Sequence, residues 1–231
     1  MSLLGEGLLQ ALRLLVTGDP EVWQITWLSL QISATATLLS LLIGVPLGAL
    51  LALSRFPGRA LAVSLVNTGM GLPPVVVGLF VTIVLWRNGM LGFLELLYTP
   101  TAMIAGQLVI AAPIVTGLTL AAVQQVPAAF RLQMLGLGAS RLQMTWVLLK
   151  EARLPMLAAV MAGFGGVISE VGASMMLGGN IKGSTRVLTT ATVLETGKGN
   201  FDLAIALSVI LLVITFLVNW ALSWIQQRRR S

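Results

Sequence analysis

The sequence predicts an all-α, polytopic membrane helix bundle with about five transmembrane helices. Hydrophobic residues make up 57% of the 231 residues and charged residues only 10%, whereas a soluble domain carries about 25% charged residues. The mean hydropathy of +0.95 points the same way. One small core cannot bury so many apolar side chains, so a lipid bilayer is the expected solvent for most of them.

The gaps between charged residues locate the spans. Five long stretches contain no Asp, Glu, Lys or Arg, apart from one carboxylate, Glu170. About 20 apolar residues cross a bilayer core of about 30 Å, so each stretch is long enough for one helix. We expect the five helices at residues 26–53, 61–86, 101–124, 155–178 and 203–226.

The segment at residues 1–22 is expected to lie in the membrane interface. Its apolar residues recur at helical spacing around Arg13, but it is short and ends at Asp19-Pro20, which favours an interfacial helix over a span. It has no basic start and no small-residue cleavage site, so we do not expect a removable signal peptide.

Lysine and arginine predict the orientation. With Arg228, Arg229 and Arg230 placed inside, nine of the 14 Lys and Arg fall in inner segments and five in outer ones. The positive-inside rule then predicts an N-terminus outside and a C-terminus in the cytoplasm. The net charge of +6 is therefore assigned to cytoplasmic loops, and no basic stripe with interleaved aromatic residues indicates a nucleic-acid surface.

Few residues are available for metal or acid–base chemistry. The sequence has no Cys, no His and a single Tyr, so we expect no catalytic residues, no metal site and no disulfide framework.

The second expected span contains a double proline, Pro73-Pro74, after Asn67. Two backbone donors are missing there, and helical geometry is disfavoured just before them. In a membrane the freed carbonyls are tolerated only beside protein or a wet cavity. A kinked helix that lines a solute pathway is one interpretation, and a kink used only for packing is the other.

The fourth expected span carries an acid and several small residues. An ionisable group such as Glu170 is costly inside a span and usually faces a bundle interior or a cavity, and glycines such as Gly172 allow close helix approach. We expect Glu170 to be a structural partner of backbone donors or of a basic group such as Arg186. A role as a substrate ligand is the alternative.

The loop from Gln124 to Pro155 is expected to form two helical pieces. Pro127 suits the first turn of a helix, Gly136 and Gly138 would end it, and Ser140 can cap a second piece. A short helix on a glycine hinge is suited to docking another protein. An ordinary interfacial loop is the alternative.

Gly138-Ala139-Ser140-Arg141, followed by Trp146 and Leu154-Pro155, resembles the cytoplasmic loop of permease subunits of type I, binding-protein-dependent ABC importers of bacteria. The Glu-Ala-Ala usual in that family is replaced by Leu132-Gln133-Met134. In that family the loop forms a coupling helix that sits in a groove of the ATPase subunit. The resemblance implies ATPase-coupling roles for Ala128, Ala129, Phe130, Arg131, Leu132, Gly136, Gly138, Ala139, Ser140 and Arg141.

Other stretches resemble one group within that family. The runs 72–79 and 168–173 resemble oxyanion permeases of the molybdate, sulfate and tungstate group, and the runs 185–190 and 197–200 are most similar to the tungstate type. The resemblance covers residues 24–227 and implies an importer for an oxyanion, with tungstate expected and molybdate or sulfate as alternatives. A tungstate-like dianion needs hydrogen-bond donors. The candidates for the pathway are Asn67, Ser169 and Ser174, which carry donors, and Pro73, Pro74, Glu170 and Gly172 on the same two spans. Helix–helix hydrogen bonding is the alternative for the hydroxyl and amide groups. Lys182 and Arg186 are candidates for an outer mouth, with solvated loop charges as the alternative. The segment 182–195 is expected to form a short outer helix that caps the pathway.

The same resemblance implies the partners and the domain organisation. We expect a single transmembrane permease domain over residues 1–231, with a transporter core at 24–227 and a coupling loop at 126–153. It would lie in the cytoplasmic (inner) membrane of a prokaryote as a multi-pass protein. Its expected partners are a second copy of itself, ABC ATPase subunits, an extracytoplasmic oxyanion-binding protein and the lipid bilayer, with no nucleic acid.

No nucleotide-binding motif of the G-x-x-x-x-G-K-[ST] type occurs in the sequence. We therefore expect no cofactor bound by this chain, with ATP and Mg held by the partner ATPase. Two other classes remain open. An ion-driven secondary transporter usually shows more spans, internal repeats and buried ionisable groups, and a non-transporting membrane scaffold would not need the double proline or Glu170.

Overall fold

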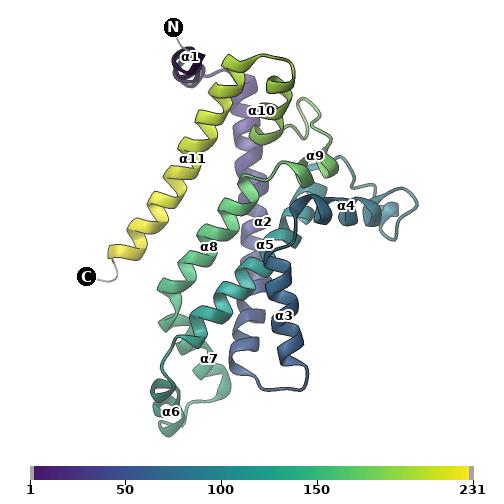
Figure 1. Cartoon of the computed structure of the whole chain (residues 1–231). Helices are drawn as coiled ribbons and strands as arrows, with labels where there is room; N and C mark the ends of the chain where they lie inside the picture. The colour runs from purple at the N-terminus through teal and green to yellow at the C-terminus, as the bar shows by residue number, and fades with distance from the viewer. Residues whose placement is uncertain (1–2, 229–231) are drawn as a thin grey trace.

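Residues 3–228, the part of the chain that the computed structural model describes, form helices joined by loops and contain no β-strand (Figure 1). The predicted all-α class is therefore confirmed. The α-helices are α1 Leu3–Thr17, α2 Pro20–Leu53, α3 Arg59–Met70, α4 Pro74–Leu85, α5 Pro100–Gln124, α6 Ala128–Gly136, α7 Arg141–Glu151, α8 Arg153–Ile168, α9 Gly172–Gly178, α10 Leu188–Gly197 and α11 Phe201–Arg228, with a 3-10 turn, η1, at Gly92–Leu94.

Helices α2 and α5 pack along their lengths through small residues. A Cβ atom added at Gly44 would lie 2.8 Å from Val115 Cγ1, and one added at Gly48 would lie 2.6 Å from the backbone oxygen of Thr116. Only glycine permits this approach of two helix backbones, which is the usual way in which membrane helices gain packing contacts. The buried small residues of α2 recur every three or four positions: Ser29, Ser33, Thr37, Ser40, Gly44 and Gly48.

Three of the buried hydroxyls of α2 donate to carbonyls of the same helix. Ser29 Oγ donates to the carbonyl of Ile25, Thr37 Oγ1 to that of Ser33, and Ser40 Oγ to that of Ala36, each over 2.7 Å. Because an unsatisfied buried hydroxyl is costly, this back-bonding allows polar side chains to lie between apolar helices.

Within residues 3–228, three helices are long and apolar enough to cross a bilayer, and two bent helix pairs add up to two further spans. The three helices are α2, α5 and α11. Helices α3 and α4 meet at 103°, and helices α8 and α9 meet at 59°. The prediction of about five spans holds when each bent pair counts as one.

The predictions of single helices at 61–86 and 155–178 were wrong. In the first, Pro73 and Pro74 lack amide donors, so α3 ends at Met70 and α4 starts afresh with Pro74 as its first residue. The turn there is far sharper than a kink. No proline marks the second break, at Ser169–Val171, which is stabilised by partners from elsewhere in the chain.

The N-terminal helix α1 lies across the end of α11: in Figure 1, α1 is seen end-on, whereas α11 runs diagonally across the picture. A Cβ added at Gly7 would lie 2.4 Å from Ile205 Cγ2, so α1 packs closely on α11. Its other face leaves Leu8, Leu9, Leu12 and Val16 exposed. This arrangement suits an interfacial helix. The predicted boundary at residue 22 needs correction, because α2 already begins at Pro20.

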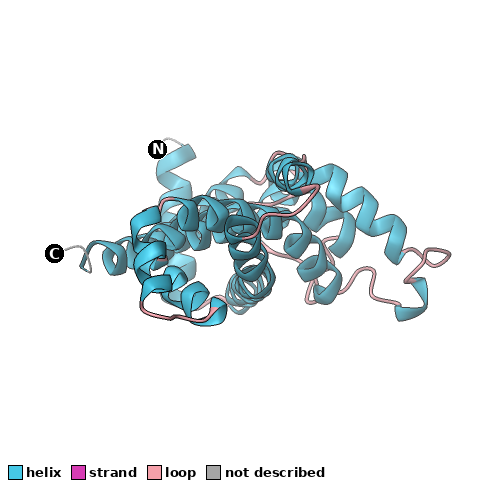
Figure 2. Cartoon of the chain, turned by 90° about the horizontal axis from the view of Figure 1, so that it is seen from below, coloured by secondary structure: helices cyan, strands magenta, loops and turns pink. Residues whose placement is uncertain are grey.

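The two ends of the molecule carry different elements. Helices α1 and α10 lie at one end and α6 and α7 at the other, while α11 and α4 lie on opposite sides of the bundle (Figures 1 and 2). Exposed tryptophans, which favour membrane–water interfaces, occur near both ends of the long helices: Trp23 and Trp27 in the first turns of α2, and Trp220 and Trp224 in the last turns of α11. Arg229 and Arg230 lie outside the described residues.

We expect the Gly48→Ala variant to destabilise the protein by about 1–3 kcal/mol, because the added methyl meets the α5 backbone rather than a movable side chain. Gly165→Ala is the matched control, because a Cβ atom there meets nothing within 4 Å. This variant therefore measures only the gain in helix propensity, about 1 kcal/mol. Denaturant unfolding of both variants in detergent measures the difference. A Gly48→Ala protein as stable as the control would show that the close α2–α5 contact is not required.

Candidate functional site

Two helix breaks that are distant in the sequence lie next to each other. A Cβ added at Gly78 of α4 would lie 2.7 Å from the Cα of Ala173 in α9. One added at Gly172 would lie 2.5 Å from Val75 Cγ2. Helices α4 and α9 therefore pack almost backbone to backbone, directly beside the two breaks, and this junction is the candidate pathway region.

The break between α3 and α4 is exposed. The side chains of Asn67 and Pro73 are exposed, and Pro74 is half-buried. The hydroxyl of Thr68 donates to the carbonyl of Ser64 over 2.9 Å. The pathway residues predicted on this segment are thus accessible from the surface of the single chain.

The break between α8 and α9 is buried around Glu170, which is 9% exposed. Glu170 Oε1 accepts a hydrogen bond of 2.9 Å from the amide of Ala173, in the first turn of α9. This contact agrees with the expected structural role, with a backbone donor as the partner. The other partner suggested for Glu170, Arg186, pairs with Glu21 instead.

The remaining predicted pathway residues of this span differ in accessibility. Ser169 is exposed and its hydroxyl donates to the carbonyl of Gly165 over 2.8 Å. Gly172 is half-buried, and Ser174 is 1% exposed. Of these residues, only Ser169 presents a polar side chain at the surface, so Ser174 could contact a solute only after a rearrangement.

Helices α6 and α7 form a hairpin at the end of the molecule opposite α10 (Figure 1). Gly138 has φ of +78°, a left-handed conformation that favours glycine. Ser140 then starts α7 through a capping box: its hydroxyl accepts from the amide of Gln143 over 3.3 Å, and its own amide donates to Gln143 Oε1 over 2.8 Å. The predicted two-piece loop and the Ser140 cap are confirmed.

The base of the hairpin is anchored and its tip is open. Phe130 packs against the buried cluster formed by Ala122, Val123, Val126, Leu148 and Ala152, and Arg131 Nη2 donates to the carbonyl of Val123 over 3.1 Å. At the tip, a groove of about 890 Å³ is lined by Leu137, Gly138, Ala139, Leu142, Gln143, Trp146 and Val147.

The predicted coupling residues follow this division. Phe130, Arg131 and Ala139 are half-buried, and the others are exposed: Ala128, Ala129, Leu132, Gly136, Gly138, Ser140 and Arg141. Large apolar side chains are also exposed here, among them Leu137 at 74% and Leu142 at 82%. An exposed apolar surface on a rigidly held hairpin is typical of a protein-docking site.

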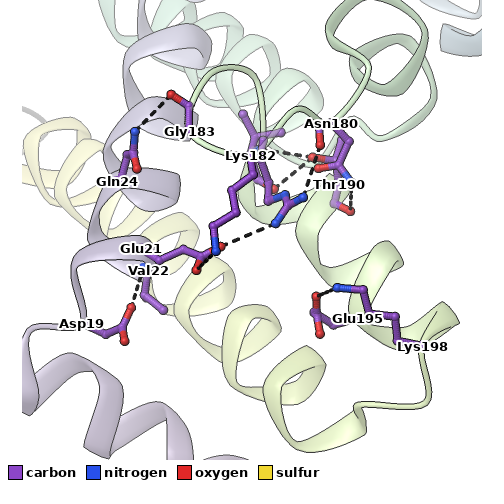
Figure 3. Close-up of polar contacts among 12 residues, drawn as sticks. Asp19, Glu21, Val22, Gln24, Asn180, Lys182, Gly183, Thr190, Glu195 and Lys198 are labelled. Atoms are coloured by element: carbon purple, nitrogen blue, oxygen red, sulfur yellow. Dashed lines mark hydrogen bonds and ion pairs between the residues drawn. The ribbon is translucent and has the colours of Figure 1, made fainter.

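A polar region at the α10 end of the molecule is called the ion-pair cleft (Figure 3). Glu21 Oε2 lies 2.6 Å from Lys182 Nζ, and Glu21 Oε1 lies 3.5 Å from Arg186 Nη1. Arg186 Nη2 also donates to the carbonyl of Asn180 over 3.5 Å. The cleft has a volume of about 500 Å³ and is lined by Gln10, Leu14, Asp19, Glu21, Val22, Ile25, Lys182, Arg186, Ala191, Glu195, Lys198, Leu203 and Leu207.

A second ion pair lines the same cleft. Glu195 Oε1 accepts from Lys198 Nζ over 2.7 Å, and Glu195 Oε2 accepts from Asn200 Nδ2 over 3.0 Å. The hydrogen bond from Lys198 lowers the pKa of the Glu195 carboxyl, burial opposes this effect, and Asn200 and the charge of Arg186 add to the lowering. Glu195 therefore stays ionised at neutral pH.

The cleft is balanced in charge, which bears on the role expected for Lys182 and Arg186. Three bases, Lys182, Arg186 and Lys198, face three acids, Asp19, Glu21 and Glu195. The lining residues belong to α1, α2, α10, α11, the two loops that join α1 to α2 and α10 to α11, and the loop between α9 and α10, which carries Lys182 and Arg186. None of them lies within residues 67–78 or 169–174. The outer-mouth role of Lys182 and Arg186 stays a prediction, and their positions favour a structural role. The expected outer helix begins at Leu188 rather than at 182, because Lys182 to Val187 form the loop that these ion pairs fasten.

Sequence reasoning missed three polar residues that the structure brings to these sites. Gln107 of α5 and Thr189 of α10 donate to carbonyls at the α8–α9 break, and Glu21 holds the loop before α10. Gln107 could have been found as an amide in the middle of an apolar span. Thr189 lies among several threonines and Glu21 among loop charges, so neither had a distinguishing signal.

Comparison with known proteins places these features in a wider group. Residues 44–231 match the family described as binding-protein-dependent transport system inner membrane component. The chain is 39% identical over 227 residues to the tungstate uptake system permease protein of Peptoclostridium acidaminophilum, covering 98% of this chain and 100% of that protein. It is 42% identical over 200 residues to a probable anion ABC transporter permease protein of Haloferax volcanii, covering 84% of this chain and 86% of that protein.

More distant proteins share the fold. The molybdenum transport system permease protein of Escherichia coli K12 is 29% identical over 93% of this chain and 99% of its own length. The solved structure of the MetNI methionine ABC transporter in an inward-facing conformation superposes with a TM-score of 0.73 at 21% identity, covering 91% of this chain and 98% of that chain.

We expect Glu170→Ala to lower the stability of the protein by about 1–3 kcal/mol, because the buried amide of Ala173 would lose its acceptor. Glu170→Gln keeps an oxygen at the same place and should unfold close to the wild type. Thermal unfolding of both variants in detergent measures this. If Glu170→Gln folds normally yet changes which solute is carried, the carboxylate acts on the solute and its role is more than structural.

Proposed function

The chain belongs to the family of binding-protein-dependent transport system inner membrane components, and from this membership we propose that it is the permease subunit of an ATP-driven ABC importer for an oxyanion, with tungstate as the substrate. Full-length identity of 39% to a tungstate uptake permease supports this substrate. Molybdate and sulfate are the alternatives, and the permeases named for them are only 29% and 27% identical.

The α6–α7 hairpin is the structural observation that supports ATP-driven transport. It has an anchored base, an exposed apolar tip and a hinge at Gly138 whose backbone favours glycine. A hairpin anchored in this way can pass a movement of an attached ATPase to α5 and α8, the helices that flank it in the chain. The ATPase subunits would hold ATP and Mg, and this chain would bind neither.

A second copy of the chain would complete the pathway. Gly71, Leu72 and Pro73 break the helix at an exposed surface, and irregular backbone at membrane depth is tolerated only beside protein or water. Helix α4 points away from the bundle (Figure 1) and exposes large apolar residues such as Phe80 at 64% and Ile83 at 54%. Two copies that face each other through this surface would enclose Asn67 and Ser169 around a common path.

The proposed docking site also sets the orientation. With the ATPase at the α6–α7 end, that end lies in the cytoplasm, and α1, α10 and the ion-pair cleft face outward, where an oxyanion-binding protein would deliver its anion. The N-terminal helix would then be external, while α11 would end on the cytoplasmic side.

We expect Gly138→Val to reduce co-purification of the ATPase with this chain by about tenfold or more, because a β-branched residue at φ of +78° is strained by about 1–3 kcal/mol and would distort the hairpin. Gly197→Ala is the matched control, because this glycine of α10 lies outside the coupling residues and has open space around its Cβ position. Affinity purification from native membranes, followed by anion-stimulated ATPase assays with the binding protein, measures both effects.

The same preparation tests the proposal as a whole. ATPase activity that rises with tungstate in the presence of the binding protein would support it. A reconstituted chain that moves tungstate without any ATPase would instead indicate an ion-driven carrier, and a chain that binds a soluble partner but moves no solute would indicate a scaffold.

A further inference from the structure

At the α8–α9 break, side chains from two other helices donate to backbone carbonyls that lack their regular helical partners. In a continuous helix the carbonyl of Val167 would accept from the amide of residue 171, and that of Glu170 from residue 174. Here the carbonyl of Val167 accepts from the amide of Glu170, three residues on, over 3.2 Å, and Gln107 Nε2 donates to the same carbonyl over 3.1 Å. Thr189 Oγ1 donates to the carbonyl of Glu170 over 3.0 Å. Both side chains are buried, at 4% and 6% exposure, so they take the place that water could not fill in an apolar interior.

The hydroxyl of Thr189 bonds across to another element, unlike the other hydroxyls of α10. Thr192 and Thr196 donate to carbonyls four residues earlier, as threonines in helices commonly do. Thr189 lies in the first turn, and residue 185 has no helical geometry. Its hydroxyl is therefore directed to Glu170, in the candidate pathway region.

The first turn of α10 is held in turn by α2. The amide of Leu188 donates to Ser29 Oγ over 2.8 Å, and the loop just before it is fastened by the Glu21 ion pairs and by Gln24 Nε2, which donates to the carbonyl of Gly183 over 3.2 Å. Figure 3 shows Glu21 and Gln24 on α2 directed toward this loop. A continuous set of contacts therefore runs from the ion-pair cleft through Thr189 to the break.

We propose that Thr189 and Gln107 are positioning residues for transport: they set the geometry of the α8–α9 break, and the Glu21 ion pairs fix Thr189 from the cleft. This inference rests on the proposed transport function. Neither residue needs to touch the anion. Helix α9 packs on α4 through Ala173 and Gly78, so a change in geometry at the α8–α9 break also displaces α4 and the α3–α4 break. A contact at the ion-pair cleft therefore affects the geometry of both breaks.

The test uses the assembled complex of this chain with its ATPase and binding protein in lipid vesicles, with tungstate as the transported probe. Thr189→Val keeps the shape and removes the hydroxyl, and Thr189→Ser restores it. Rates are counted per folded complex after size-exclusion chromatography. We expect Thr189→Val to lower the maximal transport rate on the order of five- to tenfold, the effect of one buried hydrogen bond, with an unchanged half-saturating tungstate concentration. Thr189→Ser should stay within about twofold of the wild type, because it retains the donor.

A double-mutant cycle tests the link to the cleft. If Glu21 acts through Thr189, Glu21→Gln should lower the transport rate in the wild-type background and have little further effect in Thr189→Val. Additive effects would overturn the link. A Thr189→Val complex that transports at the wild-type rate, or a loss confined to the amount of folded complex, would overturn the positioning role. If the wild-type complex itself moves no tungstate, the proposed function fails instead.

Discussion

The close contact between α2 and α5 is the constraint on which the rest of the structure depends. Glycines at 44 and 48 bring the two backbones together, and several other elements pack directly on this pair. Gly163 of α8 packs against Val115, and Gly69 of α3 packs against Pro113. The same α2 holds the start of α10 through Ser29. Both helix breaks and the ion-pair cleft are therefore positioned relative to one rigid pair.

The two helix breaks satisfy their backbones in different ways. The α3–α4 break results from two prolines and lies exposed at the surface of the single chain, whereas irregular backbone at membrane depth is tolerated only beside protein or water. The α8–α9 break is closed from within by Gln107, Thr189 and the carboxylate of Glu170. Their contact through α4 and α9 joins an exposed break to one whose backbone groups are bonded within the chain. This combination is consistent with the proposed pathway between two copies, in which Gln107 and Thr189 of each copy set the geometry of the α8–α9 break.

The two ends of the molecule differ in their chemistry. The α6–α7 end presents apolar side chains on a hairpin, whereas the α10 end holds a cleft with equal numbers of acids and bases. An unpaired basic funnel would attract a dianion, but a balanced cleft would not. Attraction of the anion is therefore better assigned to an external binding protein than to this surface, and the ion pairs are better assigned to holding the loop before α10.

The sequence by itself determined the all-α membrane class, the approximate span positions, the two-piece loop with its Ser140 cap and the family resemblance. These features follow from hydropathy, charge spacing, proline and local capping, all of which act over a few residues or one span. Tertiary structure decided the sharp turn at the double proline, the break at Ser169–Val171 and the partners of Lys182 and Arg186. The ion pairs of Glu21 join residues 161 and 165 positions apart, and the break is stabilised by Gln107 and Thr189 from two other helices. No local pattern encodes such contacts, because they exist only once the α2–α5 pair has brought those segments together.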